Sequence, residues 1–513
     1  MARARDQTRH SKIDQVNLEA LFQKWRAATP EDKFLLRLHT EEATFLLCYQ
    51  TAWQMRLLNL YGTDLCLFDA TYRTTRYALP LFFLCVRTNV CYIVVGVMVV
   101  QEETTEAIKE GLEVFKYWNT DWKPAHFMVD YSIAEIKAVE SVFEGTKAVL
   151  WDFHREKAWG EWIRKQDHQV SNKEDALAKM RAIARADTTD QYEEAVKALM
   201  DSPNWKENHS FRSWFSDTWL TEAKRWVAVF KAETLNIAIT TNNGIEHQNE
   251  TFKHKYLKAY KDSTLSEMLE IVVHTYIPEL RKKYIEGNVK SLSSYRRHKA
   301  NVPRFLWDRP TDLVRHIMSR TDSSLSERHV VQLSDGIFSV KSETHEGKSY
   351  QLAFGTKDSL PSCQCDDWRR YKLPCKHFCA VFQYVPGWTW QQLSPIYREH
   401  PLLNLDATCC SMTPVSGDEW GTEAVSQPVT CEETHVTSDY GLPPRRRARK
   451  MDLRRKCVNL NKQILDKIYV TEDEDTLEEL SEKLSTLLKD LTPLTSNEDG
   501  MPLHLEAKRV RVS

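Results

Sequence analysis

Two apolar runs close together near residue 90 constrain the fold of this chain more than any other feature. They are Leu79–Val86 and Tyr92–Val100, and the polar residues Arg87, Thr88 and Asn89 lie between them. Each run is too short to cross a bilayer. Because each has the length of a strand and a polar turn separates them, together they predict a buried β-hairpin. We therefore expect a globular chain without a membrane-spanning segment.

Shorter segments around this hairpin alternate between strand spacing and helix spacing. Strands are expected at 64–69, 125–130 and 148–154, and helices at 16–60, 104–118, 132–143 and 155–235. Thr104 is the expected N-cap of the helix at 104–118. An antiparallel meander followed by strand–helix alternation predicts an α/β fold, in which a mixed sheet carries helices on its faces.

Composition and pattern divide the chain into six regions. They are an N-terminal helical region (1–60), an α/β core (61–155), a large helical insertion (156–238), a helical completion of the core (239–320), a β-rich segment with a cysteine cluster (321–395), and a partly disordered tail with a linker, a basic run and a helix (396–513). The tail is rich in Ser, Thr, Pro and Glu, which is typical of a linker. Tryptophans bracket the insertion, and we expect them to pack in its core rather than stack on bases.

Three cysteines and a histidine stand in two close pairs, Cys363-x-Cys365 and, after nine residues, Cys375-x-His377. Thiolate and imidazole ligands suit tetrahedral zinc, and four such ligands without a carboxylate indicate a closed structural site. Four unconnected residues in a reducing compartment are the alternative. The spacing, the aromatic Trp368 in the loop and the ending Leu-Pro-Cys-Lys-His resemble the SWIM zinc finger. This resemblance implies one structural Zn²⁺ and a module that binds DNA or protein.

Positive charge in this chain is local, because the formal net charge is only −2. Four cations beside the cysteine cluster are expected either to contact phosphates or to be ordinary solvated charges: Arg369, Arg370, Lys372 and Lys376. The basic run at 445–456 predicts a nuclear localisation signal or a contact with the DNA backbone, with an exposed linker as the alternative. Leucines at 477–491 predict either a short coiled coil that forms a homodimer or an ordinary amphipathic helix.

Acidic residues beside predicted strands are candidates for metal-dependent chemistry on phosphates. Asp69 and Asp130 end the strands at 64–69 and 125–130, and Glu246 begins a helix that follows the long insertion. Carboxylates from different elements commonly hold the two divalent ions of phosphoryl transfer, and Mg²⁺ prefers oxygen ligands. Taken alone, each acid is more often a turn, cap or helix-dipole residue. The hypothesis therefore depends on the three acids meeting, in the strand order of an RNase H-like sheet.

Four blocks of the sequence resemble Mutator-like (MULE) DDE transposases, including animal members that end in a SWIM finger. They are DATYRT at 69–74, AHFMVD at 125–130, DFHREKAW at 152–159 and TNNGIEHQN at 241–249. The resemblance covers residues 40–390 and implies an RNase H-like core with a helical insertion. It also implies Asp69, Asp130 and Glu246 as the three acids, with Glu250 as the less favoured third. The implied reaction is Mg²⁺- or Mn²⁺-dependent DNA strand cleavage and transfer.

Two departures from the family pattern leave two functions open. Trp151 stands where the family has a cysteine that pairs with His154, and the short N-terminus lacks an obvious DNA-binding domain ahead of the core. The structural alternative for Trp151 is simple packing beside the insertion. In the first hypothesis the protein is a nuclear transposase-like enzyme that acts on DNA. In the second it is a captured, catalytically inactive transposase that binds DNA or protein in the nucleus. A nuclease or RNase of the same fold is a third alternative, because a fold does not settle its substrate.

Overall fold

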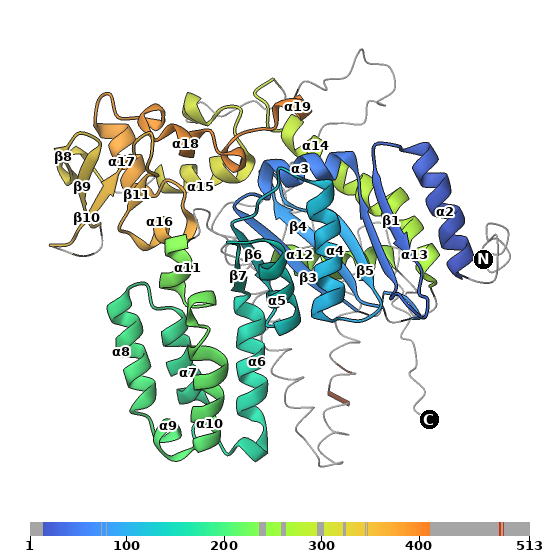
Figure 1. The fold of residues 1–513 in the computed structure, drawn as a ribbon. Coiled ribbons are helices and arrows are strands. Elements are labelled where there is room, and N and C mark those ends of the chain that lie inside the picture. The colour runs from blue at the N-terminus through green and yellow to red at the C-terminus, as the bar shows by residue number, and fades with distance from the viewer. Residues whose placement is uncertain are drawn as a thin grey trace. The chain divides into compact units, whose positions relative to one another are not determined.

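A seven-stranded mixed sheet lies at the centre of the fold (Figure 1). Its strands follow the order β1-β2-β5-β4-β3-β6-β7, with β3, β6 and β7 parallel and all other neighbours antiparallel. Their bounds are β1 (Lys33–Arg37), β2 (Leu46–Gln50), β3 (Leu65–Thr71), β4 (Leu81–Arg87), β5 (Tyr92–Val100), β6 (His126–Val129) and β7 (Lys147–Leu150). The predicted mixed sheet and its hairpin, β4–β5, are therefore confirmed.

The structure, a computed structural model, describes most of the chain up to residue 410. The described residues are 14–410 except 73, 78, 235–242, 258–262, 295–301, 322–324, 344 and 346, together with 482, 483 and 486. The basic run at 445–456 lies outside them, as do all the leucines at 477–491. No described helix is long and apolar enough to cross a membrane.

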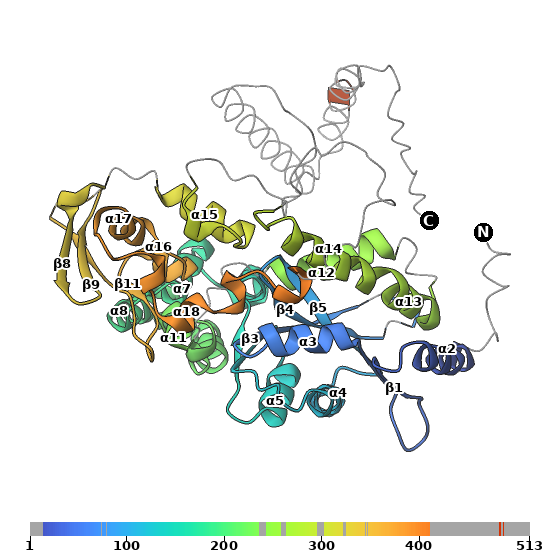
Figure 2. The ribbon, with the colours of Figure 1, turned by 90° about the horizontal axis from the view of Figure 1, so that it is seen from above.

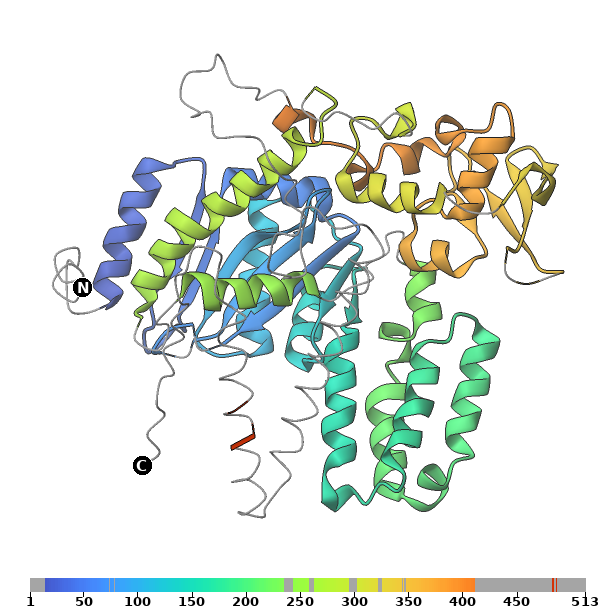
Figure 3. The ribbon, with the colours of Figure 1, turned by 180° about the vertical axis from the view of Figure 1, so that it is seen from behind.

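Helices cover both faces of the central sheet, which explains why its middle strands are apolar without alternation. α4 (Thr105–Trp118) and α5 (Ile133–Val142) lie on one face, and α12 (Asn243–Thr251) and α14 (Ile277–Val289) lie on the other (Figures 2 and 3). The predicted cap of α4 is confirmed, because the Thr104 hydroxyl accepts a hydrogen bond of 3.2 Å from the Ala107 N–H. Further helices are α2 (Asp14–Ala28), α3 (Ala52–Tyr61) and α13 (Leu265–Ile271).

Three sequence expectations differ from the structure. The segment 16–60 is not helical throughout, because β1 and β2 interrupt it and β2 extends the sheet beyond β5. The strand expected at 148–154 ends at Leu150, and a helix begins at Asp152. Residues 396–410, expected as linker, instead pack on the core, where Asp406 accepts hydrogen bonds from Arg56 and from the Tyr284 hydroxyl.

The predicted insertion is helical, as expected, and its tryptophans pack in its core. It consists of α6 (Asp152–Arg164), α7 (Lys173–Ala184), α8 (Thr189–Met200), α9 (Pro203–Glu207), α10 (His209–Trp214) and α11 (Ala228–Thr234) (Figure 3). Trp159, Trp219 and Trp226 are fully buried and meet edge to face. Aromatic pairs of this geometry add to the stability that burial alone provides.

A second, smaller sheet has a hydrophobic core of its own. It joins β8 (Val330–Ser334), β9 (Ile337–Lys341), β10 (Ser349–Ala353) and β11 (Ser362–Cys363), all antiparallel. α15 (Thr311–Thr321), α16 (Asp366–Tyr371) and α17 (Lys376–Tyr384) accompany it, and α18 (Pro395–Arg398) and α19 (Ala407–Cys410) follow. The β-rich character predicted for residues 321–395 is therefore confirmed in β8, β9, β10 and β11.

Candidate metal centre and acid site

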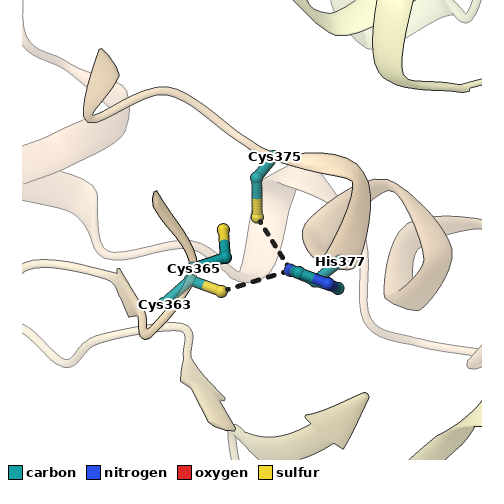
Figure 4. A group of neighbouring side chains, drawn as sticks. All are labelled: Cys363, Cys365, Cys375 and His377. Atoms are coloured by element: carbon teal, nitrogen blue, oxygen red, sulfur yellow. Dashed lines mark hydrogen bonds between the residues drawn. The ribbon is translucent and has the colours of Figure 1, made fainter. Parts of the chain in front are cut away.

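The four predicted zinc ligands come from a strand end and two helix starts. Cys363 ends β11, Cys365 caps α16, Cys375 caps α17, and His377 lies in the first turn of α17. All four side chains are buried, and one ligand atom from each lies within 4.8 Å of the others. Figure 4 shows the sulfur atoms and the imidazole turned toward a common centre.

The distances within this group fit a tetrahedral zinc ion. The Nδ1 atom of His377 lies 3.6 Å from the Sγ atoms of both Cys363 and Cys375. Zinc bonds of about 2.3 Å to sulfur and about 2.0 Å to nitrogen place tetrahedral neighbours about 3.5 Å apart. Ordinary ligand bonds to one zinc ion therefore reproduce the observed spacing, with His377 binding through Nδ1.

The chain between the two ligand pairs turns back in a short helix, α16. α16 ends at Tyr371, and the cap residue Lys372 has a φ of 49°, in the left-handed region. The Lys372 N–H donates to the Trp368 carbonyl at 2.7 Å, and the Tyr397 hydroxyl donates to the Lys372 carbonyl at 2.9 Å. These bonds fix the turn that brings the second pair to the first.

Two of the four cations beside the metal centre have acidic partners. The Lys376 ammonium donates to Glu343 at 2.6 Å, and Arg369 lies 3.7 Å from Asp366. Burial lowers the pKa of Lys372 from its usual value, and the charge of Arg369 lowers it further. Contact of these residues with phosphates stays a prediction.

Asp69 and Asp130 lie side by side on neighbouring parallel strands. The register of β3 and β6 pairs Leu65 with His126 and Leu67 with Met128. Two residues further along each strand are Asp69, inside β3, and Asp130, directly after β6. Since side chains two residues apart share a face of a sheet, both acids point to the same side.

α12 brings the third predicted acid to the same place. Gly244 lies against the ring of Tyr92, and a Cβ atom there would come within 2.4 Å of it. This close approach lets α12 lie on the sheet, where the Gln248 amide donates to the Tyr92 carbonyl at 2.9 Å. Glu246 then faces the acid site, whereas Glu250 is exposed. The geometry favours Glu246 as the third acid.

Two residues that sequence reasoning did not place in the acid site join the carboxyl groups together. His154, in the first turn of α6, contacts Asp130 through Nδ1 and Glu246 through Nε2, the latter at 2.9 Å. The Asn249 amide donates to the Asp69 carboxyl at 2.6 Å. The histidine that the family pattern pairs with a cysteine is thus held by two acids. Trp151, at the cysteine's position, is buried.

Two segments of the chain match known families. Residues 28–149 match the family model described as zinc finger SWIM domain-containing protein 1/3, RNaseH-like domain. Residues 329–386 match the SWIM zinc finger.

The chain contains an RNase H-like domain and a SWIM zinc finger.

The RNase H-like match includes Asp69 and Asp130 and ends before Glu246. A comparison with curated proteins finds no match. Derivation from a Mutator-like transposase is part of neither family match and stays a prediction.

Charge in the RNase H-like acid site is only partly balanced by the protein. Burial and the nearby carboxyl groups of Asp130 and Glu246 raise the pKa of Asp69 to about 8. Burial lowers the pKa of His154, but its hydrogen bonds to Asp130 and Glu246 outweigh that effect and raise the pKa to about 10. His154 is therefore protonated at neutral pH and is the cation of the site.

The acid site has oxygen atoms that suit a divalent cation. Oδ1 of Asp130 and Oδ1 of Asn249 are buried and have no hydrogen-bond partner among the described residues. Mg²⁺ and Mn²⁺ bind such oxygens, so the residues fit the predicted ion. Within the described ranges, however, only the SWIM cluster brings three or more ligand side chains close enough to share one ion. His154 lies between Asp130 and Glu246 and keeps them apart.

A pocket of ≈ 290 Å³ opens beside Asp130 on the side of α5 and α6. Its walls include Tyr72, Glu103, Glu135, Lys157 and Glu161. Burial, and then the charges of Asp130 and Asp69, hold the pKa of Glu135 well above its usual value. No sequence signal pointed to Glu135, because it occupies an ordinary position in the first turn of a helix.

Proposed function

We propose that the RNase H-like core cleaves and transfers DNA strands with Mg²⁺ or Mn²⁺, and that the SWIM finger and the basic tail bind the DNA. One observation carries this proposal. Acids from the end of β6 and from α12, far apart in the sequence, meet at the ring of His154, and Asp69 on β3 lies close enough to interact with their charges. Such convergence is what metal-dependent phosphoryl transfer requires of a protein.

Each residue of the site has a distinct part in this reaction. Asp69, Asp130 and Glu246 would hold the metal, which supplies polarisation of the phosphate and stabilisation of the attacking and leaving oxygens. Asn249 fixes the rotamer of Asp69 through its 2.6 Å hydrogen bond. His154 offsets the negative charge of the free site, and it has to leave Asp130 or Glu246 when a cation binds there.

We also propose a second, alternative function, in which His154 stays paired with the acids and no metal ion replaces it. The imidazolium of His154 already satisfies Asp130 and Glu246, so the site is closed by an ion pair. A core held in this state would serve as a scaffold, and the SWIM finger would bind DNA or a protein partner without strand cleavage. Trp151, buried at the family's cysteine position, is consistent with such a change of role.

The chemistry is tested by nicking of DNA that carries transposon terminal repeats, in the presence of Mn²⁺. The variants are Asp130→Asn, Glu246→Gln and, as the matched control, Glu250→Gln on the exposed side of α12. We expect Asp130→Asn and Glu246→Gln to lose at least about 100-fold in rate, because each removes a metal ligand. Glu250→Gln should cleave like wild type.

The opposite results would favour the scaffold function. Equal nicking by wild type and Asp130→Asn would reject the catalytic role of the acids. Absence of nicking in all four proteins, with DNA still bound, would identify a binding protein. A nuclear location, directed by the basic run at 445–456, and a homodimer through the C-terminal helix belong to both proposals.

A further inference from the structure

The pocket beside Asp130 contains a carboxyl group that the proposed three-acid site does not use. Glu135 lies in the first turn of α5, after the cap residue Ser132. Its side chain is only 2% exposed, yet it lines the pocket. Its Oε2 atom is buried and has no hydrogen-bond partner among the described residues.

Neither protonation state of Glu135 satisfies this position without a ligand. An ionised carboxylate loses its hydration on burial, and the nearby carboxyl groups of Asp130, Asp69 and Glu103 also disfavour its charge, whereas a single backbone hydrogen bond from Asp130 favours it. A neutral carboxyl group would leave its second oxygen or its proton without a partner, which also costs free energy. A buried group of this kind calls for an explanation, and a bound ion is one that its charge and position fit.

The other two glutamates of the pocket wall do not have this problem. Glu103 accepts hydrogen bonds from the hydroxyls of Tyr72 and Ser132. Glu161 is exposed, and the Lys157 ammonium lies 4.0 Å away from it. Among the glutamates of the pocket wall, only Glu135 therefore has an unsatisfied acceptor in the described part of the chain.

Asp130 presents a second unsatisfied oxygen in the same place. Its Oδ2 atom contacts His154, whereas its Oδ1 atom is buried and has no hydrogen-bond partner in the described part of the chain. Two carboxyl oxygens, one after β6 and one on α5, therefore border the same pocket without a donor. Mg²⁺ is commonly held by one or two carboxylates together with several waters, so this pair is sufficient.

We propose that Glu135 is a fourth carboxylate of the acid site, and that it and Asp130 bind a divalent cation from the pocket side. Asp130 would then serve two partners, with Oδ2 on His154 and Oδ1 on the cation. A cation at this position does not require His154 to move. The inference rests on the proposed function, because it adds a ligand to the same site.

The test is Mn²⁺ binding to the full-length, zinc-loaded protein, measured by the electron paramagnetic resonance signal of free Mn²⁺. The variant is Glu135→Gln, which keeps the shape of the side chain, and the matched control is Glu161→Gln in the same pocket wall. We expect Glu135→Gln to weaken Mn²⁺ binding more than about tenfold, and Glu161→Gln to change it less than about twofold. Equal Mn²⁺ affinity in wild type and Glu135→Gln would overturn the inference.

Zinc content and circular dichroism report whether the variants fold. If Glu135→Gln does not fold, Glu135→Asp replaces it in the test. This variant keeps the negative charge, but its shorter side chain moves the carboxyl oxygens away from the pocket. Unchanged Mn²⁺ affinity in Glu135→Asp would then reject the role of Glu135.

Failure of this inference is distinguishable from failure of the proposed function. Loss of Mn²⁺ binding in Asp130→Asn but not in Glu135→Gln leaves the acid site in place and removes Glu135 from it. If Glu135→Gln binds Mn²⁺ more weakly than wild type but wild type does not nick DNA, the cation site is supported and the catalytic function is rejected.

Discussion

His154 sets the charge balance of the acid site at the scale of single residues. Its two ring nitrogens face two different carboxyl groups, Asp130 and Glu246, which come from different elements. The protonated ring therefore links α6, α12 and the end of β6. A metal ion bound there would compete with His154 for the same carboxyl oxygens, so the proposed function couples stability to metal binding at this residue.

Replacement of His154 by alanine tests this coupling. Without added divalent ions, His154→Ala should lower the free energy of unfolding by about 1–2 kcal/mol, because two carboxyl groups lose their shared donor. Saturating Mn²⁺ should recover most of that loss. Thermal denaturation with and without Mn²⁺ measures both effects, and His247→Ala, exposed on α12, is the control. A loss that Mn²⁺ does not recover would contradict the coupling.

The raised pKa of Asp69 predicts a pH dependence of stability with a definite sign. The unfolded chain releases this proton near pH 3.8, whereas the folded protein keeps it until about pH 8. The folded state is therefore favoured below pH 3.8, and that contribution is lost as the pH rises toward 8. Each unit of the pKa difference corresponds to about 1.4 kcal/mol.

Asp69→Asn should remove this contribution. Relative to wild type, the variant should become progressively more stable between pH 4 and pH 8, as measured by urea denaturation without added divalent ions. A constant difference across that range would show that Asp69 does not titrate in this way.

Residues of the acid site differ in how far the sequence could identify them. Asp69 and Asp130 stand beside strands, where functional residues of α/β sheets gather, so a local pattern identified them as candidates. Asn249 and His154 have partners 180 and 92 residues away, and no local spacing records such contacts. Glu135 could not be identified from the sequence, because only its burial in the folded protein distinguishes it from other glutamates in the first turn of a helix.

At the scale of elements, the docking of α12 decides whether the third acid reaches the site. The helix lies on the sheet through a glycine, because any Cβ atom at Gly244 would overlap the ring of Tyr92. The Gln248 side chain donates a hydrogen bond to the Tyr92 carbonyl and accepts one from the Tyr276 hydroxyl. These two bonds hold the helix in register.

Gly244→Ala should therefore displace α12 and lower the stability by about 1–3 kcal/mol. The control is Gly160→Ala in α6, where a Cβ atom would meet nothing within 4 Å. That substitution should stabilise the protein by about 0.5–1 kcal/mol, because alanine is the better helix former. Urea denaturation measures the free energy of unfolding of both variants. Similar changes in the two would contradict the close approach of Gly244 to Tyr92.

Elements with a clear period were predictable, and short buried ones were not. The apolar hairpin and the capped helix α4 were found from length and spacing, and the small sheet was foreseen as a β-rich segment. β1 and β2 are only five residues each, and a short apolar run reads equally well as buried helix or strand. Pairing of β2 with β5, distant in the chain, decides between them.

At the scale of the whole molecule, the described residues form two separate hydrophobic cores. One surrounds the seven-stranded sheet and the insertion, and the other surrounds the small sheet and the zinc ligands. Because Cys363, Cys365 and Cys375 belong to the second core, zinc supports that core directly. The two parts should therefore respond differently to loss of the metal.

Chelation of zinc should unfold residues from about 355 to 385 and leave the seven-stranded sheet folded. Hydrogen exchange should rise in α16 and α17 and stay slow in β3, β4 and β5. Cys375→Ala should act like the chelator, whereas Cys379→Ala, a buried cysteine outside the ligand group, should retain zinc. Unchanged circular dichroism with no zinc released would reject the structural metal.

The central claim is that Asp69, Asp130 and Glu246 form a divalent-metal site despite their distance in the chain. The most direct measurement is anomalous diffraction at the manganese edge from crystals soaked in Mn²⁺. We predict a peak about 2 Å from carboxyl oxygens of Asp69 and Asp130, beside α12. A crystal at saturating Mn²⁺ with no peak among these acids, and with His154 still bridging Asp130 and Glu246, would contradict it.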